Sequence, residues 1–174
     1  NDYRGWEFYK DTRVLYGSVI IGDKTHKNPT PTRMSWRPDK MICEYEIDGV
    51  TIREEKFIGA DDAAASIITA SQPVILRFEG HSFYVRHSVS SSASARYDSP
   101  TNSIMIREGG TVRSLPDPDR PERIGPCVYQ GMTTALSSSA DFSKSLKLNK
   151  DHRGVWEYSF EIPCNIEGVT VSWS

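Results

Sequence analysis

The stretch Trp156-Glu157-Tyr158-Ser159-Phe160-Glu161-Ile162 decides the fold of this 174-residue chain. Its four large apolar residues alternate with polar ones, and a period of two puts all four on one face of a β-strand. Strands that pack one face on a core and expose the other to water are typical of antiparallel sheets. The stretch therefore predicts an antiparallel sheet with one buried face.

The same alternation recurs upstream. Residues 74–79, 83–89 and 104–106 each place apolar side chains at alternate positions. In the second of these runs His87 shares the apolar face with valines, so we interpret it as a core residue rather than as part of a site. No segment shows a sustained helical period.

Turn signals separate these runs. Asp48-Gly49 is the strongest short hairpin signal in the sequence. Residues 97–102 and 108–111, Arg153-Gly154 and Glu167-Gly168 are further predicted turns. Turns about every 8–12 residues predict an all-β fold, a two-sheet antiparallel β-sandwich with little helix that forms a single domain over residues 1–174.

Three segments interrupt the strands. Residues 23–40 contain three prolines, which cannot donate to a strand ladder, so we expect a long ordered loop there. Residues 116–121 form a second predicted loop, and the Ser- and Lys-rich residues 137–150 are expected to cross the surface. Because long loops in compact domains are usually functional or disordered, residues 23–40 are the first place to look for a site.

The charge balance limits the partners. Lys and Arg number 21 against 23 Asp and Glu, a net charge of −2 at pH 7, so the sequence lacks the basic excess of a nucleic-acid binder. Its apolar runs are far shorter than the roughly 20 residues of a membrane span. We therefore expect neither nucleic acid nor a membrane as a partner.

The chain ends and the cysteines bear on the origin of the protein. The chain starts at Asn1 without a methionine and stops at Ser174 within a strand-like pattern, so we expect a fragment of a longer chain. Cys43, Cys127 and Cys164 are odd in number and widely spaced, which predicts buried thiols rather than a disulfide framework or a zinc site. A soluble protein of the bacterial cytoplasm or periplasm fits these features.

The sequence lacks the common catalytic and metal-binding patterns. Its four histidines do not have the close spacing of metal ligands, and it contains no Gly-x-Ser-x-Gly elbow and no phosphate-binding glycine loop. Glu54 and Glu55 are adjacent, so on a strand they face opposite sides and cannot act as a pair. We predict no catalytic residue, no metal site and no cofactor.

Aromatic residues among charged ones form the remaining candidate site. Sugars expose flat C–H faces that aromatic rings cover, and hydroxyls that charged side chains bind. Trp36 has such neighbours within residues 23–40, and the chain start adds further rings. Alternatively, Trp36 plugs the edge of the core with Arg37 stacked on it, and the sequence leaves both interpretations open. The predicted sugar contacts are Trp36, Arg37, Arg33, His26, Asp23, Trp6 and Tyr9.

A longer pattern carries a resemblance. It begins with Trp36-Arg37-Pro38-Asp39-Lys40 and Cys43-Glu44-Tyr45-Glu46-Ile47-Asp48-Gly49-Val50, continues through residues 56–58 and 63–80, and ends with Glu167-Gly168-Val169-Thr170-Val171-Ser172-Trp173. This strand rhythm resembles the N-terminal β-supersandwich that precedes an (α/α)6 barrel in several glycoside hydrolase and phosphorylase families. It covers most of the chain, and it is a rhythm rather than a signature motif.

The resemblance implies a function. In those enzymes the catalytic acid and base belong to the helical barrel, the sandwich packs against that barrel, and a sandwich loop often helps to wall the active site. For this chain the resemblance implies a supersandwich-like accessory domain of a carbohydrate-active enzyme, without catalysis of its own and with residues 23–40 as the wall. The implied partners are a carbohydrate and a catalytic (α/α)6 domain in the same chain.

Each function that fits the residues makes a different structural demand. An accessory domain would expose a large apolar patch where the barrel docks. A free-standing carbohydrate-binding module needs two or three coplanar aromatic rings on a concave sheet face. A small all-β lyase or isomerase needs a cavity lined by His, Tyr, Arg and Glu, and a structural, capsid-like sandwich would associate through an exposed strand edge.

Overall fold

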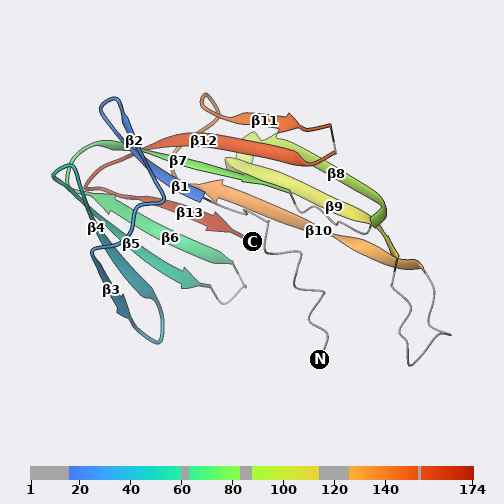
Figure 1. The fold of residues 1–174 in the computed structure, drawn as a ribbon, viewed down its shortest axis with the longest axis horizontal. Helices are drawn as coiled ribbons and strands as arrows, with labels where there is room; N and C mark the ends of the chain where they lie inside the picture. Colours follow the sequence, from blue (N-terminus) through green and yellow to red (C-terminus); the bar gives the residue numbers. More distant parts are fainter. Residues whose placement is uncertain (1–15, 60–62, 83–87, 114–125, 153) are drawn as a thin grey trace.

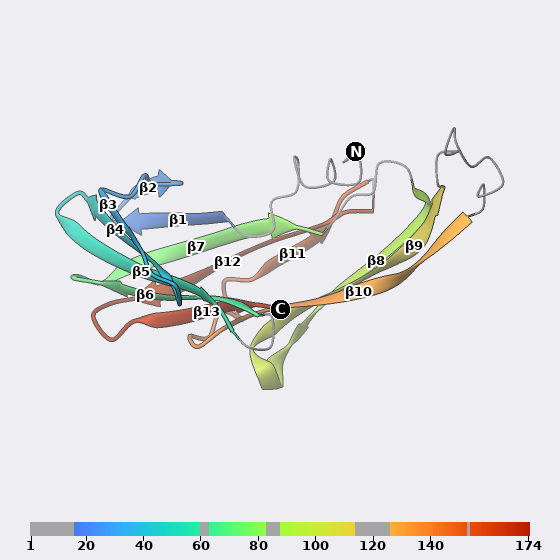
Figure 2. The same cartoon turned by 90° about the horizontal axis from the view of Figure 1, so that it is seen from below.

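The computed structural model describes residues 16–59, 63–82, 88–113, 126–152 and 154–174. In these ranges the chain forms two antiparallel sheets, one of five strands and one of eight, which lie in two layers (Figure 1 and Figure 2). The helical structure in the described part of the chain is a single 3-10 turn between two strands. The predicted fold class, a two-sheet antiparallel β-sandwich with little helix, is confirmed.

The smaller sheet contains five strands. In spatial order they are β11 (Lys147–Lys150), β12 (Trp156–Cys164), β7 (Val74–His81), β1 (Tyr16–Ile21) and β2 (Lys24–Lys27). β12 pairs Phe160 with Phe78 and Ile162 with Leu76 of β7. The stretch that predicts the fold is therefore an inner strand, and its apolar face continues across the neighbouring strand.

The larger sheet contains eight strands. In spatial order they are β3 (Arg33–Trp36), β4 (Met41–Ile47), β5 (Val50–Ile58), β6 (Ala64–Ala70), β13 (Val169–Trp173), β10 (Pro126–Ser138), β9 (Ser103–Arg113) and β8 (Ser88–Asp98). Its edge strands are β3 and β8, which come from distant parts of the sequence. The C-terminal strand β13 lies near the centre.

Backbone geometry explains two of the predicted turns. Asp48 and Gly49 have φ values of 48° and 79° and join β4 to β5, as a two-residue hairpin with two positive φ angles requires. Gly168 has a φ of 83° in the turn before β13, and a Cβ atom there would lie 2.9 Å from Thr69 Cγ2. The predicted turn at residues 97–102 is also confirmed, between β8 and β9.

The predicted turn at residues 108–111 is wrong, because these residues lie inside β9. Gly110 pairs with Tyr129 of β10 on one side and with Ser91 of β8 on the other. β10 loses its register just beyond Tyr129 and regains it at Met132. Glycine inside a strand is typical of such a place, because the missing side chain accommodates an irregular neighbouring strand.

The predicted loop over residues 23–40 is wrong in part, because it contains the strands β2 and β3. Pro29 and Pro31 fall between these strands, and Pro38 lies in the turn that follows β3. A proline removes only its own N–H from a ladder, so short strands form between the prolines. The segment is a pair of edge strands with proline-containing connections.

Residues 137–150 are more than the predicted surface crossing. Phe142 is only 1% exposed, and the last four residues of the segment form β11. One buried ring among serines and lysines has no periodic partner along the chain, so the sequence pattern does not reveal it. The predicted loop at residues 116–121 and the predicted core residue His87 lie outside the described residues.

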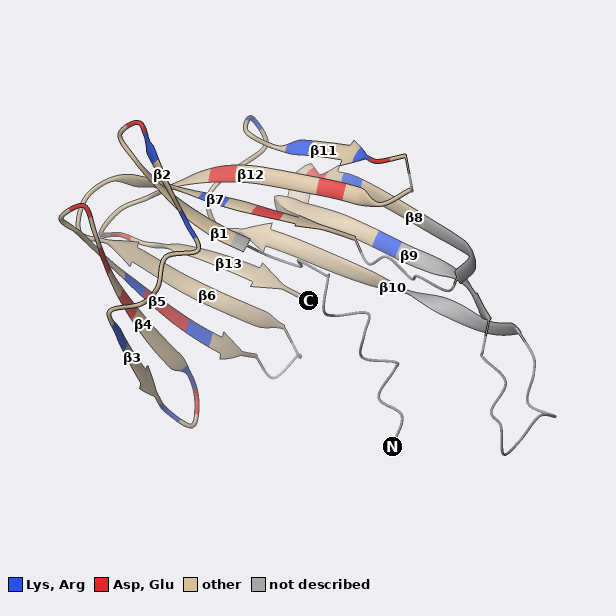
Figure 3. Ribbon diagram, in the orientation of Figure 1, with Lys and Arg blue, Asp and Glu red and all other residues tan. Residues whose placement is uncertain are grey.

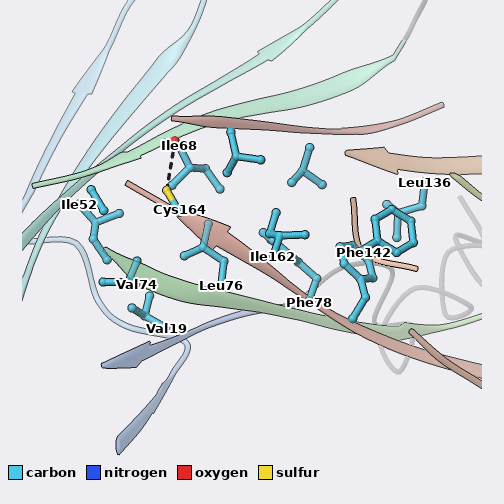
Figure 4. Close-up of a cluster of buried hydrophobic side chains, with 14 of the residues drawn as sticks. Val19, Ile52, Ile68, Val74, Leu76, Phe78, Leu136, Phe142, Ile162 and Cys164 are labelled. Atoms are coloured by element: carbon cyan, nitrogen blue, oxygen red, sulfur yellow. Dashed lines mark hydrogen bonds between the residues drawn. The ribbon is translucent and has the colours of Figure 1, made fainter. Parts of the chain in front are cut away.

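The core lies between the sheets and contains a row of aromatic rings (Figure 4). Phe142 stacks on Phe160 with ring centroids 4.3 Å apart, and Phe160 stacks on Phe78 at 5.4 Å. Tyr97 of β8 meets Phe142 edge to face at 5.5 Å. These contacts join residues from both sheets and from the segment before β11.

Two cysteines take part in the core. Cys43 and Cys164 are buried free thiols, as predicted, whereas the side chain of Cys127 lies outside the described residues. Cys164 Sγ donates to the backbone carbonyl of Ile68 at 3.4 Å, a bond between β12 and β6 that Figure 4 shows. Burial raises the pKa of the Cys164 thiol to about 11, so this thiol stays protonated and unreactive.

Replacing Phe142 by alanine tests its place in the core. We expect Phe142→Ala to lower the free energy of unfolding by about 3–5 kcal/mol, because the cavity it leaves is flanked by rings of both sheets. Denaturant unfolding followed by far-UV circular dichroism measures this loss. The exposed Lys144→Ala is the control and should change stability by less than about 0.5 kcal/mol; an equal effect of both variants would contradict the buried position of Phe142.

Candidate functional site

The eight-stranded sheet extends past the five-stranded one where β3, β4 and β5 project away from it (Figure 1). Across this end the register pairs Trp36 with Met41, Met41 with Lys56, Lys56 with Ser66, and Ser66 with Val171. Directly paired residues point to the same side of a sheet. Because Val171 is buried in the core, the whole row lies on the inner face.

The uncovered part of this inner face is hollow, and we call it the inner-face groove. It encloses about 530 Å³. Trp36 is 80% exposed and Ile58 is 75% exposed, while Trp173 is partly buried. The exposure of Trp36 excludes the interpretation that it plugs the edge of the core. The inward-facing residues that define the groove are Trp36, Met41, Lys56, Ile58, Ala64, Ser66 and Trp173.

A polar cluster lies where the groove approaches the five-stranded sheet, and we call it the Glu54 cluster. Glu54 accepts hydrogen bonds from Tyr45 Oη and Ser66 Oγ, both at 2.9 Å, and Lys56 Nζ lies 3.1 Å from its carboxylate. These four side chains line a second hollow of about 320 Å³, which reaches residues of the five-stranded sheet. Lys56 and Ser66 line both hollows, so the two adjoin.

The Glu54 cluster has a defined protonation pattern. Burial raises the pKa of the Tyr45 phenol, and the neighbouring Glu54 carboxylate raises it further. Tyr45 therefore keeps its proton and donates to Glu54 at neutral pH. Since Ser66 donates to one Glu54 oxygen and Tyr45 to the other, the carboxylate is held in one orientation.

The sequence of β5 explains how the groove arises. Its inward-facing residues are Val50 and Ile52, which are buried, then Glu54 and Lys56, and finally the exposed Ile58. The strand therefore changes from core to polar surface without changing face. This break in the apolar alternation is the signal in the sequence from which the cluster could have been found.

Glu55 belongs to a different network from Glu54, as their adjacency predicts. Its carboxylate accepts hydrogen bonds from Lys40 Nζ and Arg53 Nη2. The hydrogen bond from Lys40 is the larger cause that lowers the pKa of the Glu55 carboxyl, and the bond from Arg53 is the next. The two glutamates therefore do not form a cooperating carboxylate pair.

Two of the predicted sugar contacts lie together at the groove. Arg37 lines it beside Trp36. Arg33 belongs to the same strand as Trp36 but pairs with an outward-facing residue of β4, so it lies on the opposite face of the sheet. Trp6 and Tyr9 lie outside the described residues.

The structure does not bring His26 and Asp23 to the groove. His26 Nε2 and Lys24 Nζ lie 3.3 Å and 3.2 Å from Asp48 Oδ2, and the hydrogen bond from Lys24 is the main cause that lowers the pKa of Asp48. Asp48 follows the seven residues of β4, a distance of about 20 Å from the Trp36 end of the sheet. Lys24 and His26 instead connect the β1–β2 hairpin of one sheet to the β4–β5 turn of the other, and Asp23 lies in the turn of that hairpin.

The outer face of the eight-stranded sheet has a charge-free centre. The adjacent strands β6, β13 and β10 contain no Asp, Glu, Lys or Arg, and β6 and β13 are tan throughout in Figure 3. Ile67 is 41% exposed on this face. Charged residues of β5 and of β8 and β9 flank it. We call it the outer-face patch, and its residues are Ala65, Ile67, Thr69, Thr170, Ser172, Ser137, Ala135 and Met105.

A third hollow, of about 320 Å³, lies over β7, β11 and β12. Among the described residues its lining includes Glu79, His81, Glu157 and Tyr158, but no arginine, which the hypothesis of an all-β enzyme also requires. Within the described ranges, no group of three or more His, Cys, Asp or Glu residues could hold a metal ion.

Comparison with known proteins finds no family model that matches the chain and no curated protein that matches it. In the part of the chain that the structure describes, no helix has the length and apolar character needed to cross a membrane. The function therefore has to be argued from the surfaces described above.

The raised pKa of Tyr45 predicts a pH dependence of stability. Above about pH 10 the phenol ionises in the unfolded chain but not in the folded one, so Tyr45 contributes stability below that pH and the contribution falls as pH rises. Denaturant unfolding of wild type and Tyr45→Phe between pH 7 and pH 11 measures it. We expect wild type to be more stable by about 1 kcal/mol at pH 7 and the difference to shrink above pH 10. A difference that stays constant to pH 11 would mean that Tyr45 titrates as a free phenol.

Proposed function

We propose that this protein is an accessory β-sandwich domain of a carbohydrate-active enzyme, without catalysis of its own, which packs against a catalytic helical domain of the same natural chain. The observation that carries the proposal is the outer-face patch. A sheet in a two-layer sandwich normally exposes charged and polar side chains on its outer face. Here three adjacent strands present none that are charged.

The composition of the patch supports a protein partner. Interfaces are depleted of charged residues at their centre and carry a polar, charged rim. The patch has this arrangement, with Ile67 exposed at its centre and Arg53 and Arg96 on strands that flank it. Most of its side chains are those of alanine, serine and threonine, which are short enough for a helix to approach the sheet closely.

The carbohydrate part of the proposal rests on the strand rhythm and on Trp36. The rhythm from Trp36 to Trp173 resembles the supersandwich of glycoside hydrolases and phosphorylases, in which the helical barrel holds the catalytic acid and base. Trp36 is the last residue of β3 and Arg37 follows it on an exposed part of the sheet, which suits a wall at the edge of a neighbouring sugar site. The segment that the sequence predicts as the wall therefore contributes these two residues.

Cysteine labelling tests the packing surface. Ile67→Cys is introduced into the isolated domain and into the full-length natural chain, and the rate of alkylation at that residue is followed by peptide mass spectrometry. We expect labelling in the full-length chain to be slower by about tenfold or more, because a docked domain excludes water from the centre of its interface. Site-resolved detection separates the new thiol from the native cysteines.

The matched control is Lys147→Cys on β11, an exposed position on the other sheet. It should be alkylated at the same rate in the isolated domain and in the full-length chain. Equal rates for Ile67→Cys in the two proteins, or protection of Lys147→Cys alone, would contradict packing through the outer-face patch.

A further inference from the structure

We infer that the inner-face groove binds a neutral, hydroxyl-rich chain, an oligosaccharide, which lies across β3, β4, β5, β6 and β13 and passes beside the Glu54 cluster. The inference rests on the carbohydrate part of the proposed function and does not depend on the outer-face patch. The groove and the patch lie on opposite faces of the same sheet, so a helical partner and a sugar chain can be bound together.

The apolar half of the groove suits sugar rings. Trp36 is 80% exposed at one end of the groove, and Trp173 lies on the same face of the sheet farther in. Met41 and Ile58 lie on this face between them. Indole faces bind the C–H faces of pyranose rings, and a large apolar side chain left open in a hollow indicates a binding surface.

The Glu54 cluster, on the hollow that adjoins the groove, suits hydroxyl groups. Tyr45 and Ser66 donate their hydroxyl protons to Glu54, so their oxygens face a ligand as acceptors, and the Tyr45 oxygen also lies within hydrogen-bonding reach of the Cys43 thiol. Lys56 has three N–H donors and directs one toward Glu54, and its side chain is 41% exposed. The cluster therefore offers acceptors and donors side by side, as a hydroxyl that both donates and accepts requires.

The charges of the groove select a neutral ligand. Among the described residues, each cation that lines the groove lies within ion-pair distance of a carboxylate, which weakens its attraction for phosphates or uronic acids. A single ionic group on a ligand would have to break one of these pairs. The three pairs are Arg37–Asp39, Lys40–Glu55 and Lys56–Glu54.

The dimensions of the groove favour a chain over a single sugar. The row from Trp36 to Val171 crosses five strands, about 19 Å at the usual spacing between strands. The larger hollow alone encloses about 530 Å³, within the range of ligand-binding sites. A monosaccharide would contact either Trp36 or the Glu54 cluster, whereas an oligosaccharide can contact both.

Titration of the chain with defined oligosaccharides tests the inference. The probes are cellohexaose, maltohexaose, xylohexaose, mannohexaose and laminarihexaose, with hexagalacturonate as the anionic comparison, measured by calorimetry and by tryptophan fluorescence. We expect one neutral class to bind, and hexagalacturonate not to bind. Trp36→Ala should weaken that binding by about tenfold or more. Glu54→Gln should weaken it as well, because the amide keeps only one of the two acceptor oxygens that Tyr45 and Ser66 use and loses the negative charge that faces Lys56.

Two variants serve as controls. Arg33→Ala removes a charge from the same strand as Trp36 but from the opposite face, and Ile166→Ala removes another exposed apolar side chain far from the groove. Both should bind as wild type does. Denaturant unfolding checks that Trp36→Ala is folded, and its stability should lie within about 0.5 kcal/mol of wild type because the side chain is exposed.

The outcomes separate the inference from the proposed function. Binding that Trp36→Ala and Glu54→Gln weaken and the controls keep supports the groove. Binding that Trp36→Ala and Glu54→Gln leave unchanged overturns the groove while it supports a carbohydrate function elsewhere on the domain. No binding of any neutral hexasaccharide by the folded chain overturns the inference, and the labelling of Ile67→Cys decides the packing surface independently.

Discussion

The overlap of two sheets of unequal size governs this structure. Where the five-stranded sheet covers the eight-stranded one, the inward positions are mostly apolar, with Thr134 and Ser138 as buried polar exceptions. Phe78, Phe160 and Phe142 stack there with ring centroids 4.3–5.4 Å apart. Beyond the overlap the same inward positions face water. The Glu54 cluster lies at this boundary and satisfies its own polar groups, since an unpaired carboxylate next to the core would be costly. The core and the groove are therefore two parts of one continuous surface.

The outer face follows a different rule. It is free of charge at its centre, although nothing in a two-layer sandwich requires that. A groove with polar and apolar ends on one side and an uncharged patch on the other give the larger sheet two surfaces of different chemistry. This division is consistent with a domain that contacts a folded partner through one face and a hydroxylated chain through the other.

Local signals in the sequence predicted the parts of the fold that depend on near neighbours. The alternation in β12 and the Asp48-Gly49 turn are such signals, because side-chain period and positive φ act within a few residues. The turn predicted at residues 108–111 is wrong because its glycines lie in a strand opposite the irregular part of β10. Since β10 is distant in sequence, nothing near these glycines distinguishes them from turn residues. The sequence pattern does not reveal Phe142, because the rings that it contacts come from β12 and β8 and not from its own segment. The predicted sugar contacts differ in the same respect. Arg37 lies beside Trp36 because the two are adjacent in sequence. Arg33 lies on the opposite face because of the strand register, and His26 lies beside Asp48 at the far end of β4.

The central claim is that the inner face of the larger sheet is open at Trp36, and hydroxyl-radical footprinting tests it most directly. Trp156 is an internal reference, because it is partly buried and its indole N–H donates to the Ala93 carbonyl at 2.9 Å. The account predicts that Trp36 is oxidised several-fold faster than Trp156 in the folded chain, and at a similar rate in denaturant. Equal rates in the folded chain would mean that the end of the sheet is covered, and would contradict the account.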